Sequence, residues 1–198
     1  MAISYPISLP TQGIKQISLT MVNTTAMVAS PFTGQQQVYR HQGDFWKASI
    51  HLTTMVRDTA EDWISALGSL YGRYGTMLIG DPTGATPRGT ISGSPTVNGA
   101  GQTGTTLTVN AITGTLKAGD YIQLGTGATS RLHKVLQDVA DGGTTLEIFP
   151  RLRESPANAA PITYTDTKGL FRLEKTETPF KYVSPRTASI SFDIIEAI

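Results

Sequence analysis

Hydrophobic and polar residues alternate along three stretches of the chain, a period that is typical of half-buried β-strands. These stretches run from Ile14 to Val22, from Asp44 to Met55, and from Thr187 to the last residue, Ile198. The apolar faces of the second and third stretches consist of Trp46, Ala48, Ile50, Leu52, Ala188, Ile190, Phe192 and Ile194. We expect the C-terminal strand to pair in one sheet with the other two, because so apolar a strand would promote aggregation at a free edge.

Between the second and third stretches the apolar period changes to three or four residues, which predicts one amphipathic helix. Asp58 precedes it, Glu61 follows at capping-box spacing, and Gly72 is a natural stop. The predicted apolar stripe consists of Ala60, Trp63, Leu67, Leu70 and Tyr74. We interpret the acidic residues of the first turn, including Asp62, as groups that favour the helix dipole rather than as an acid–base pair.

The composition shifts in the middle of the chain. Residues 84–130 hold ten of the twenty glycines and only three charged residues. Short strands separated by turns are expected at residues 106–112, 120–124, 131–137 and 144–150. Asp141, Gly142 and Gly143 form the predicted hairpin turn between the last two. This spacing favours a small β-barrel or sandwich.

These patterns predict a mainly-β fold. We expect residues 1–86 and 167–198 to form one discontinuous unit, a β-sandwich with one flanking α-helix. Residues 87–166 then form an inserted small β-barrel module, since insertions enter at loops and chain ends often lie close together. Two sequential β-domains are the alternative.

The charge balance excludes several classes of partner. The chain carries 16 basic and 15 acidic residues, and only 16% of its residues are charged, against about 25% in an average soluble domain. We therefore expect no specific nucleic-acid binding and no attraction to an anionic membrane. A surface poor in charge is instead typical of the cores of protein–protein interfaces. The N-terminus does not resemble a signal peptide and no stretch reaches about 18 apolar residues, so we expect folding in a cytoplasm without a membrane partner.

No catalytic constellation is visible. The chain has no cysteine, which excludes disulfides and thiolate chemistry. Its three histidines, His41, His51 and His133, lack metal-ligand spacing. The sequence GAGQTG at residues 99–104 matches a dinucleotide fingerprint, but a strand pattern follows it where that fold needs a helix. We expect no enzyme activity, catalytic residue, cofactor or metal.

Two stretches of the sequence resemble a known family. Residues 30–82 contain SPFTGQQQVYRHQGDFW, a strand ending in LTTM, a helix with AEDW, and YGRYGTMLIGDP. This order of strand, helix, Gly-rich turn, apolar strand and Asp-Pro exit resembles the N-terminal domain of distal tail proteins of long-tailed bacteriophages. The later stretch from LKAGDYIQLG to IFPRLR looks like the small β-barrel modules of phage tail proteins.

The resemblance implies a structural role in a virion assembled in the host cytoplasm. Distal tail proteins form a six-fold ring that continues the tail tube and holds the tip or baseplate hub proteins. Their N-terminal domain is a β-sandwich with a flanking helix. Outward modules in some relatives bind carbohydrate or attach receptor-binding proteins, but this chain has only one compact insert. Within such a homo-oligomer we expect the nearly uncharged segment around QQQVYR to lie at the subunit contact, with Phe32, Gln35, Gln36, Gln37, Val38 and Tyr39.

Other functions stay open at this point. A tail tube or head–tail joining protein belongs to the same class but stacks into polymers. A carbohydrate-binding module would use the insert, whose few aromatics are Tyr121, Phe149 and Tyr164. A cell-wall hydrolase would need a close carboxylate pair or a metal triad, and neither is visible in the sequence.

Overall fold

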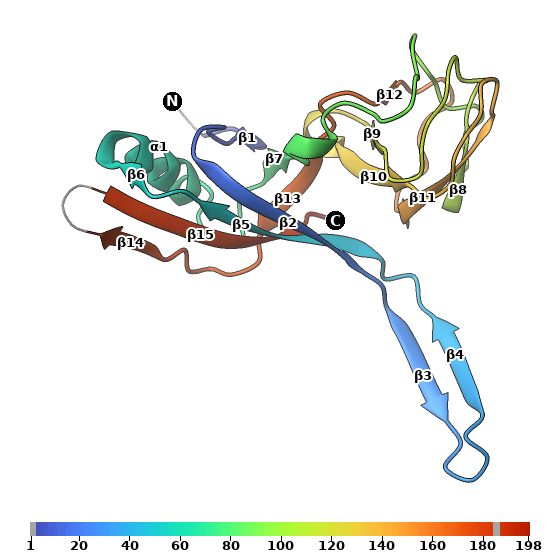
Figure 1. The fold of residues 1–198 in the computed structure, drawn as a ribbon, viewed down its shortest axis with the longest axis horizontal. Coiled ribbons are helices and arrows are strands. Elements are labelled where there is room, and N and C mark those ends of the chain that lie inside the picture. Colours follow the sequence, from blue (N-terminus) through green and yellow to red (C-terminus); the bar gives the residue numbers. More distant parts are fainter. Residues whose placement is uncertain (1–2, 184–186) are drawn as a thin grey trace.

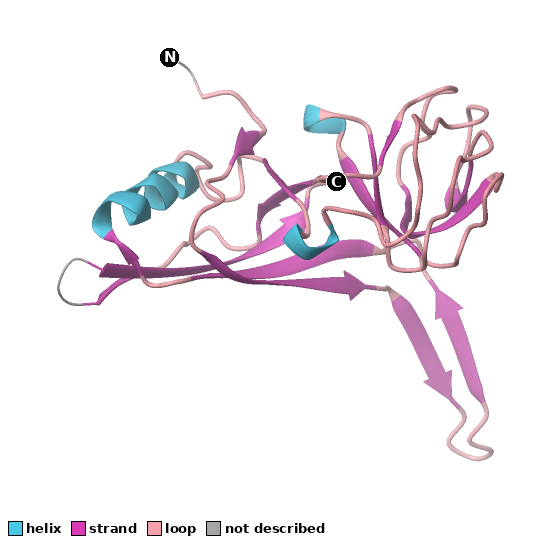
Figure 2. Ribbon diagram, turned by 45° about the horizontal axis from the view of Figure 1, so that its top comes forward, coloured by secondary structure: helices cyan, strands magenta, loops and turns pink. Residues whose placement is uncertain are grey.

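The computed structural model describes residues 3–183 and 187–198, and it confirms a mainly-β fold with one α-helix in that part of the chain. Residues 1–2 and 184–186, which belong to the discontinuous unit expected above, lie outside the described residues. Figure 1 shows a bent main sheet with the helix above it, a second sheet at one end, and a long hairpin that projects away from both. Figure 2 shows the same arrangement turned, with the hairpin still clear of the body.

The main sheet has the strand order β1-β7-β13-β15-β5-β2, and β14 and β6 pair with the outer half of β15. All pairs are antiparallel except β1 with β7. The strands are β1 (Ile7–Ser8), β2 (Ile14–Val22), β5 (Phe45–Leu52), β6 (Met55–Val56), β7 (Met77–Ile79), β13 (Gly169–Leu173), β14 (Phe180–Val183) and β15 (Thr187–Glu196). The predicted pairing of the C-terminal strand with the strand at 44–55 is confirmed, with Ile194 opposite Ala48. The other expected partner, the strand at 14–22, pairs instead with β5 in the same sheet.

The alternating faces predicted for β5 and β15 are also confirmed. Their apolar residues are buried and form the core of the main sheet, together with Trp63, Leu67 and Leu70 from the helix. The Trp63 ring lies against Phe192 at a centroid distance of 6.1 Å. Helix and sheet thus share one core.

Three details of the helix differ from the prediction. Helix α1 runs from Arg57 to Gly68, directly after β6, so its N-cap is Val56 and no side chain caps it. Asp58 lies inside the first turn, and Glu61 instead pairs with Arg57 at 3.5 Å. The predicted capping box is therefore wrong, because the pairing of β6 with β15 fixes an earlier start. The helix ends before Gly72, and Tyr74 is exposed rather than part of the stripe.

A second sheet surrounds a separate core in the middle of the chain. Its order is β12-β9-β10-β11-β8, and all its pairs are antiparallel. The strands are β8 (Gly104–Thr108), β9 (Tyr121–Leu124), β10 (Arg131–Val135), β11 (Thr145–Leu152) and β12 (Ile162–Thr163), with short 3-10 helices η1 (Pro82–Gly84) and η2 (Gly127–Thr129). Val109, Leu116, Ile122 and Ile148 are among its buried residues.

Trp46 joins the main sheet to the second sheet. It lies on β5, and its indole N–H donates to the carbonyl of Leu132 on β10 at 3.0 Å. Its ring meets Phe149 of β11 edge-on, with a centroid distance of 5.1 Å. Arg153 donates to the carbonyl of Asp44 beside it. Because one buried side chain packs in both units, the second sheet is held directly against the main sheet.

The chain leaves the main sheet after β7 and returns to it at β13, and these strands are neighbours. Gly80 follows β7 where the two crossing segments come closest. A Cβ atom at residue 80 would overlap the backbone carbonyl of Thr167. Glycine is required there by close approach of backbone to backbone.

We therefore expect Gly80→Ala to lower the free energy of unfolding by about 1–3 kcal/mol, since an added methyl group must displace backbone in a packed region. Urea unfolding followed by circular dichroism measures this. Gly68→Ala is the matched control, because nothing lies within 4 Å of its added Cβ, and alanine favours the helix by up to about 1 kcal/mol. Equal stability of the two variants would contradict the assigned close approach.

Candidate functional site: a projecting hairpin and an apolar groove

Strands β3 (Thr25–Ala29) and β4 (Gln36–Arg40) form a two-stranded hairpin that continues the β2–β5 pair beyond the body of the protein. All ten strand residues are exposed. At its base, His41 donates its backbone N–H to Thr24 at 2.8 Å, and the Thr24 hydroxyl donates to the Gly43 carbonyl at 3.0 Å. These bonds tie the two strands together where they leave the sheet.

The hairpin exposes apolar side chains on both of its faces. Met27 stands opposite Val38, and the next pair, on the other face, places Tyr39 opposite Ala26. Met27, Val38 and Tyr39 are all more than half exposed. A hairpin that buries neither face is marginally stable alone in water, and apolar patches of this kind mark protein–protein contact sites.

The tip of the hairpin is a defined turn that carries an aromatic ring. Ser30 donates its backbone N–H to Gln35 at 2.9 Å and accepts from Gly34 at 2.9 Å. Gly34 has a φ of 69°, the left-handed conformation that favours glycine. Phe32, at the outer end, is 95% exposed. The turn thus presents a large apolar side chain to solvent.

The structure places all six residues expected at a subunit contact on this hairpin. Phe32 and Gln35 lie in the turn, and the others belong to β4: Gln36, Gln37, Val38 and Tyr39. Sequence reasoning missed the partner strand β3, and with it Met27 and Val28. The signal was present in the short apolar run TAMVA, which stands just before the turn cluster.

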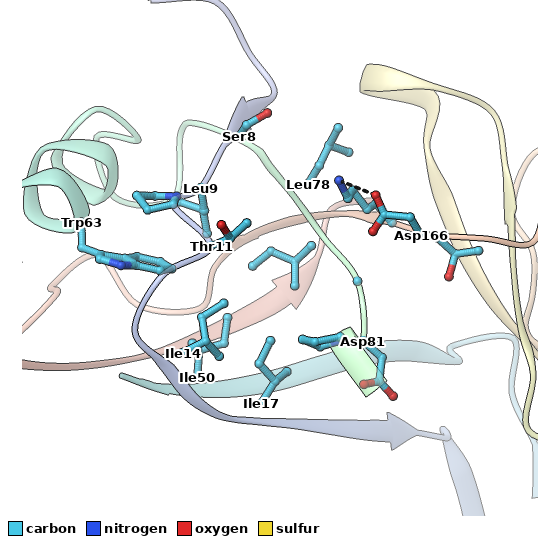
Figure 3. A pocket seen from close by; sticks show the side chains of 16 residues that line it. Ser8, Leu9, Thr11, Ile14, Ile17, Ile50, Trp63, Leu78, Asp81 and Asp166 are labelled. Carbon is cyan, nitrogen blue, oxygen red and sulfur yellow. Dashed lines mark ion pairs between the residues drawn. The ribbon is translucent and has the colours of Figure 1, made fainter. Parts of the chain in front are cut away.

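An apolar groove lies between β1 and β2, the two end strands of the main sheet. Its volume is about 440 Å³, and its walls come from both end strands of the bent sheet, β1 and β2, from the segment joining them, and from β5, β7 and α1. Figure 3 shows Ile14, Ile17 and Ile50 along it, with Trp63 and Asp81 at opposite ends. Since β1 and β2 do not pair, the sheet leaves this gap open.

The charged groups near the groove are engaged with neighbours in their own chain. Asp81 accepts from the backbone N–H and the hydroxyl of Thr83, at 2.9 and 2.7 Å. Lys168 pairs with Asp166 at 3.3 Å. Burial, with the nearby Asp81 carboxylate, raises the pKa of Tyr121 to about 12. The groove is therefore lined mainly by apolar side chains, and the charged groups at its polar end have partners in their own chain.

The candidate chemical motifs form no common site. The Gly-rich sequence at 99–104 is a loop that leads into strand β8, and the Gln102 side chain bridges it through bonds to Asn98 and Thr108. Across residues 3–183 and 187–198, no group of three or more acidic or histidine side chains could hold a metal ion. No helix in that part of the chain is long and apolar enough to cross a membrane.

The insert's aromatic residues do not gather on one exposed surface. Tyr121 and Phe149 are buried against Trp46 at the joint between the sheets. Neither a protein-family model nor a curated protein sequence matches this chain. The hairpin and the groove are thus the surfaces with exposed apolar side chains that bear on function.

His133 is buried in strand β10, where its Nδ1 lies 2.8 Å from the carbonyl oxygen of Pro150. Burial lowers the pKa of His133 from 6.5 to about 4. The folded protein thus keeps this ring neutral at a pH where the unfolded chain protonates it. Stability from this residue is fully present above pH 6.5 and is lost as the pH falls toward 4.

We expect the free energy of unfolding to fall by about 2 kcal/mol between pH 7.5 and pH 5 because of His133. In His133→Asn an amide N–H replaces the Nδ1 donor, so this part of the pH dependence should disappear, although the variant is less stable at every pH. Urea unfolding at both pH values measures the difference. His51→Asn, at an exposed position, should retain the wild-type dependence; the assignment fails if His133→Asn retains it too.

Proposed function

We propose that this protein is a structural subunit of a bacteriophage tail that forms a six-fold ring at the distal end of the tail tube. The ring joins the tube to tip or baseplate hub proteins. The observation that carries this proposal is the hairpin β3–β4, which projects from the body with apolar side chains exposed on both faces. Such a hairpin needs a partner on each side.

The placement of the hairpin favours a ring over a symmetric dimer. It leaves the molecule at one end of the main sheet, whereas the apolar groove lies near the other end of β2. Contact between two different surfaces of identical subunits is heterologous, and it closes into a ring when the rotation between subunits allows it. A two-fold dimer would instead use one surface twice.

The order of elements supports the resemblance to distal tail proteins. Residues 30–82 run from the hairpin tip through β5, α1 and β7 to the Asp81-Pro82 exit, which is the order that the resemblance implies. The segment that carries the second sheet follows that exit, and the second sheet packs against one end of the main sheet. A compact outward module is what such a ring carries.

Light scattering should give a molar mass of about six times the 21.2 kDa of one chain. Negative-stain images should show rings. Tyr39→Glu places a charge on the hairpin and should lower the mass toward that of the monomer without changing the thermal unfolding of the body. Leu136→Glu is the matched control, because Leu136 is an exposed apolar residue of the second sheet's unit.

A wild-type protein that stays monomeric at every concentration would overturn the proposal. Long tubes in place of rings would favour a tail tube protein. Rings that persist in Tyr39→Glu would remove the hairpin from the subunit contact.

A further inference from the structure

No side chain of residues 3–183 or 187–198 fills the groove between the two end strands. Its apolar wall is formed by Ile14, Ile17, Ile50, Leu78 and Ile79. Ile50 and Ile79 are buried at its base, whereas Ile14, Ile17 and Leu78 are partly exposed beside the gap between β1 and β2. An apolar cavity of about 440 Å³ lies in the size range of sites that bind a ligand or a side chain.

The hairpin tip exposes an aromatic side chain that packs against no core of its own chain. Phe32 is almost fully exposed, and Pro31 precedes it in a turn fixed by the backbone bonds between Ser30, Gly34 and Gln35. Residues 23–43 contain no acidic residue, and their two basic residues, Arg40 and His41, lie near the base of the hairpin. A neutral, preordered aromatic tip is able to enter an apolar groove without burying a charge.

The Phe32 side chain cannot reach the groove of its own molecule. Ile17 lies near the start of β2, and the chain continues along β2 and β3 in one general direction before it reaches Phe32. At about 3.3 Å per strand residue, the two are separated by roughly 40 Å. Any contact between them is therefore a contact between two copies.

We propose that the hairpin tip of one copy, with Phe32 as its anchor, inserts into the groove of the next copy. The occupant of the groove is thus a second copy of this chain. A buried aromatic in a well-formed apolar pocket is typical of the few residues that dominate an interface. This inference rests on the proposed ring, and it names the contact that repeats around it.

The absence of cysteine from the chain makes the contact testable by cross-linking. The double variant Phe32→Cys, Ile17→Cys should give a ladder of disulfide-linked oligomers on a non-reducing gel after mild oxidation, up to the size of the closed ring. A disulfide needs Cα atoms within about 7 Å. The pair Phe32→Cys, Leu136→Cys is the matched control and should stay at the background of the Phe32→Cys single variant.

A second measurement keeps an aromatic side chain at position 32. Benzoylphenylalanine replaces Phe32, the assembled full-length protein is irradiated, and the linked peptides are identified by mass spectrometry. Links from residue 32 to residues 9–17 or 77–82 of another copy support the inference.

The outcomes separate the two proposals. Rings whose residue 32 links outside the groove, with no ladder above the control, overturn the docking inference and leave the ring intact. Wild-type protein that remains monomeric in light scattering overturns the ring itself. Ladders and groove links together support both.

Discussion

Strand β15 lies between β5 and β13. Its backbone hydrogen bonds therefore hold together a segment from the first third of the sequence and one from the last third. Its apolar side, Ala188, Ile190, Phe192 and Ile194, forms the floor of the core that α1 covers. In the sequence, residues 80–168 lie between β7 and β13. This segment must therefore leave the main sheet and return to it at neighbouring strands. The pairing of β7 with β13 makes these two strands neighbours.

The joint between the sheets is built from buried polar groups as well as from rings. Glu196, at the end of β15, accepts the backbone N–H of Trp46 at 2.9 Å, and its burial raises the pKa of its carboxyl group. Arg131 donates to the carbonyl of Ala197 at 3.1 Å. Three buried atoms of this joint, Asp44 Oδ1, Arg131 Nε and Arg153 Nε, have no hydrogen-bond partner in the described part of the chain. The network is thus only partly satisfied, which makes its burial costly. In the proposed ring this joint sets the direction in which each second sheet points.

The sequence predicted the elements in which burial follows a simple period. β5 and β15 each bury every second residue, and α1 buries Trp63 and Leu67 on one side, so their patterns are visible without a partner. The capping box failed because its signal is local, whereas the start of α1 is set by the pairing of β6 with a strand more than a hundred residues away. β3 was missed because an exposed strand has no buried face and therefore no alternation.

The groove could not be predicted for a further reason. It exists only because β1 and β2, the two end strands of the bent sheet, do not pair. No local sequence pattern predicts the order of strands in a sheet. The position of the groove relative to the hairpin is nevertheless fixed by short-range chemistry, the bonds of Thr24 to His41 and Gly43 that set how the hairpin leaves the β2–β5 pair. If the tip of one copy occupies the groove of the next, the angle at this base determines the rotation between neighbours. Ring order would then depend on the few bonds at the base of the hairpin more than on the area of the contact at its tip.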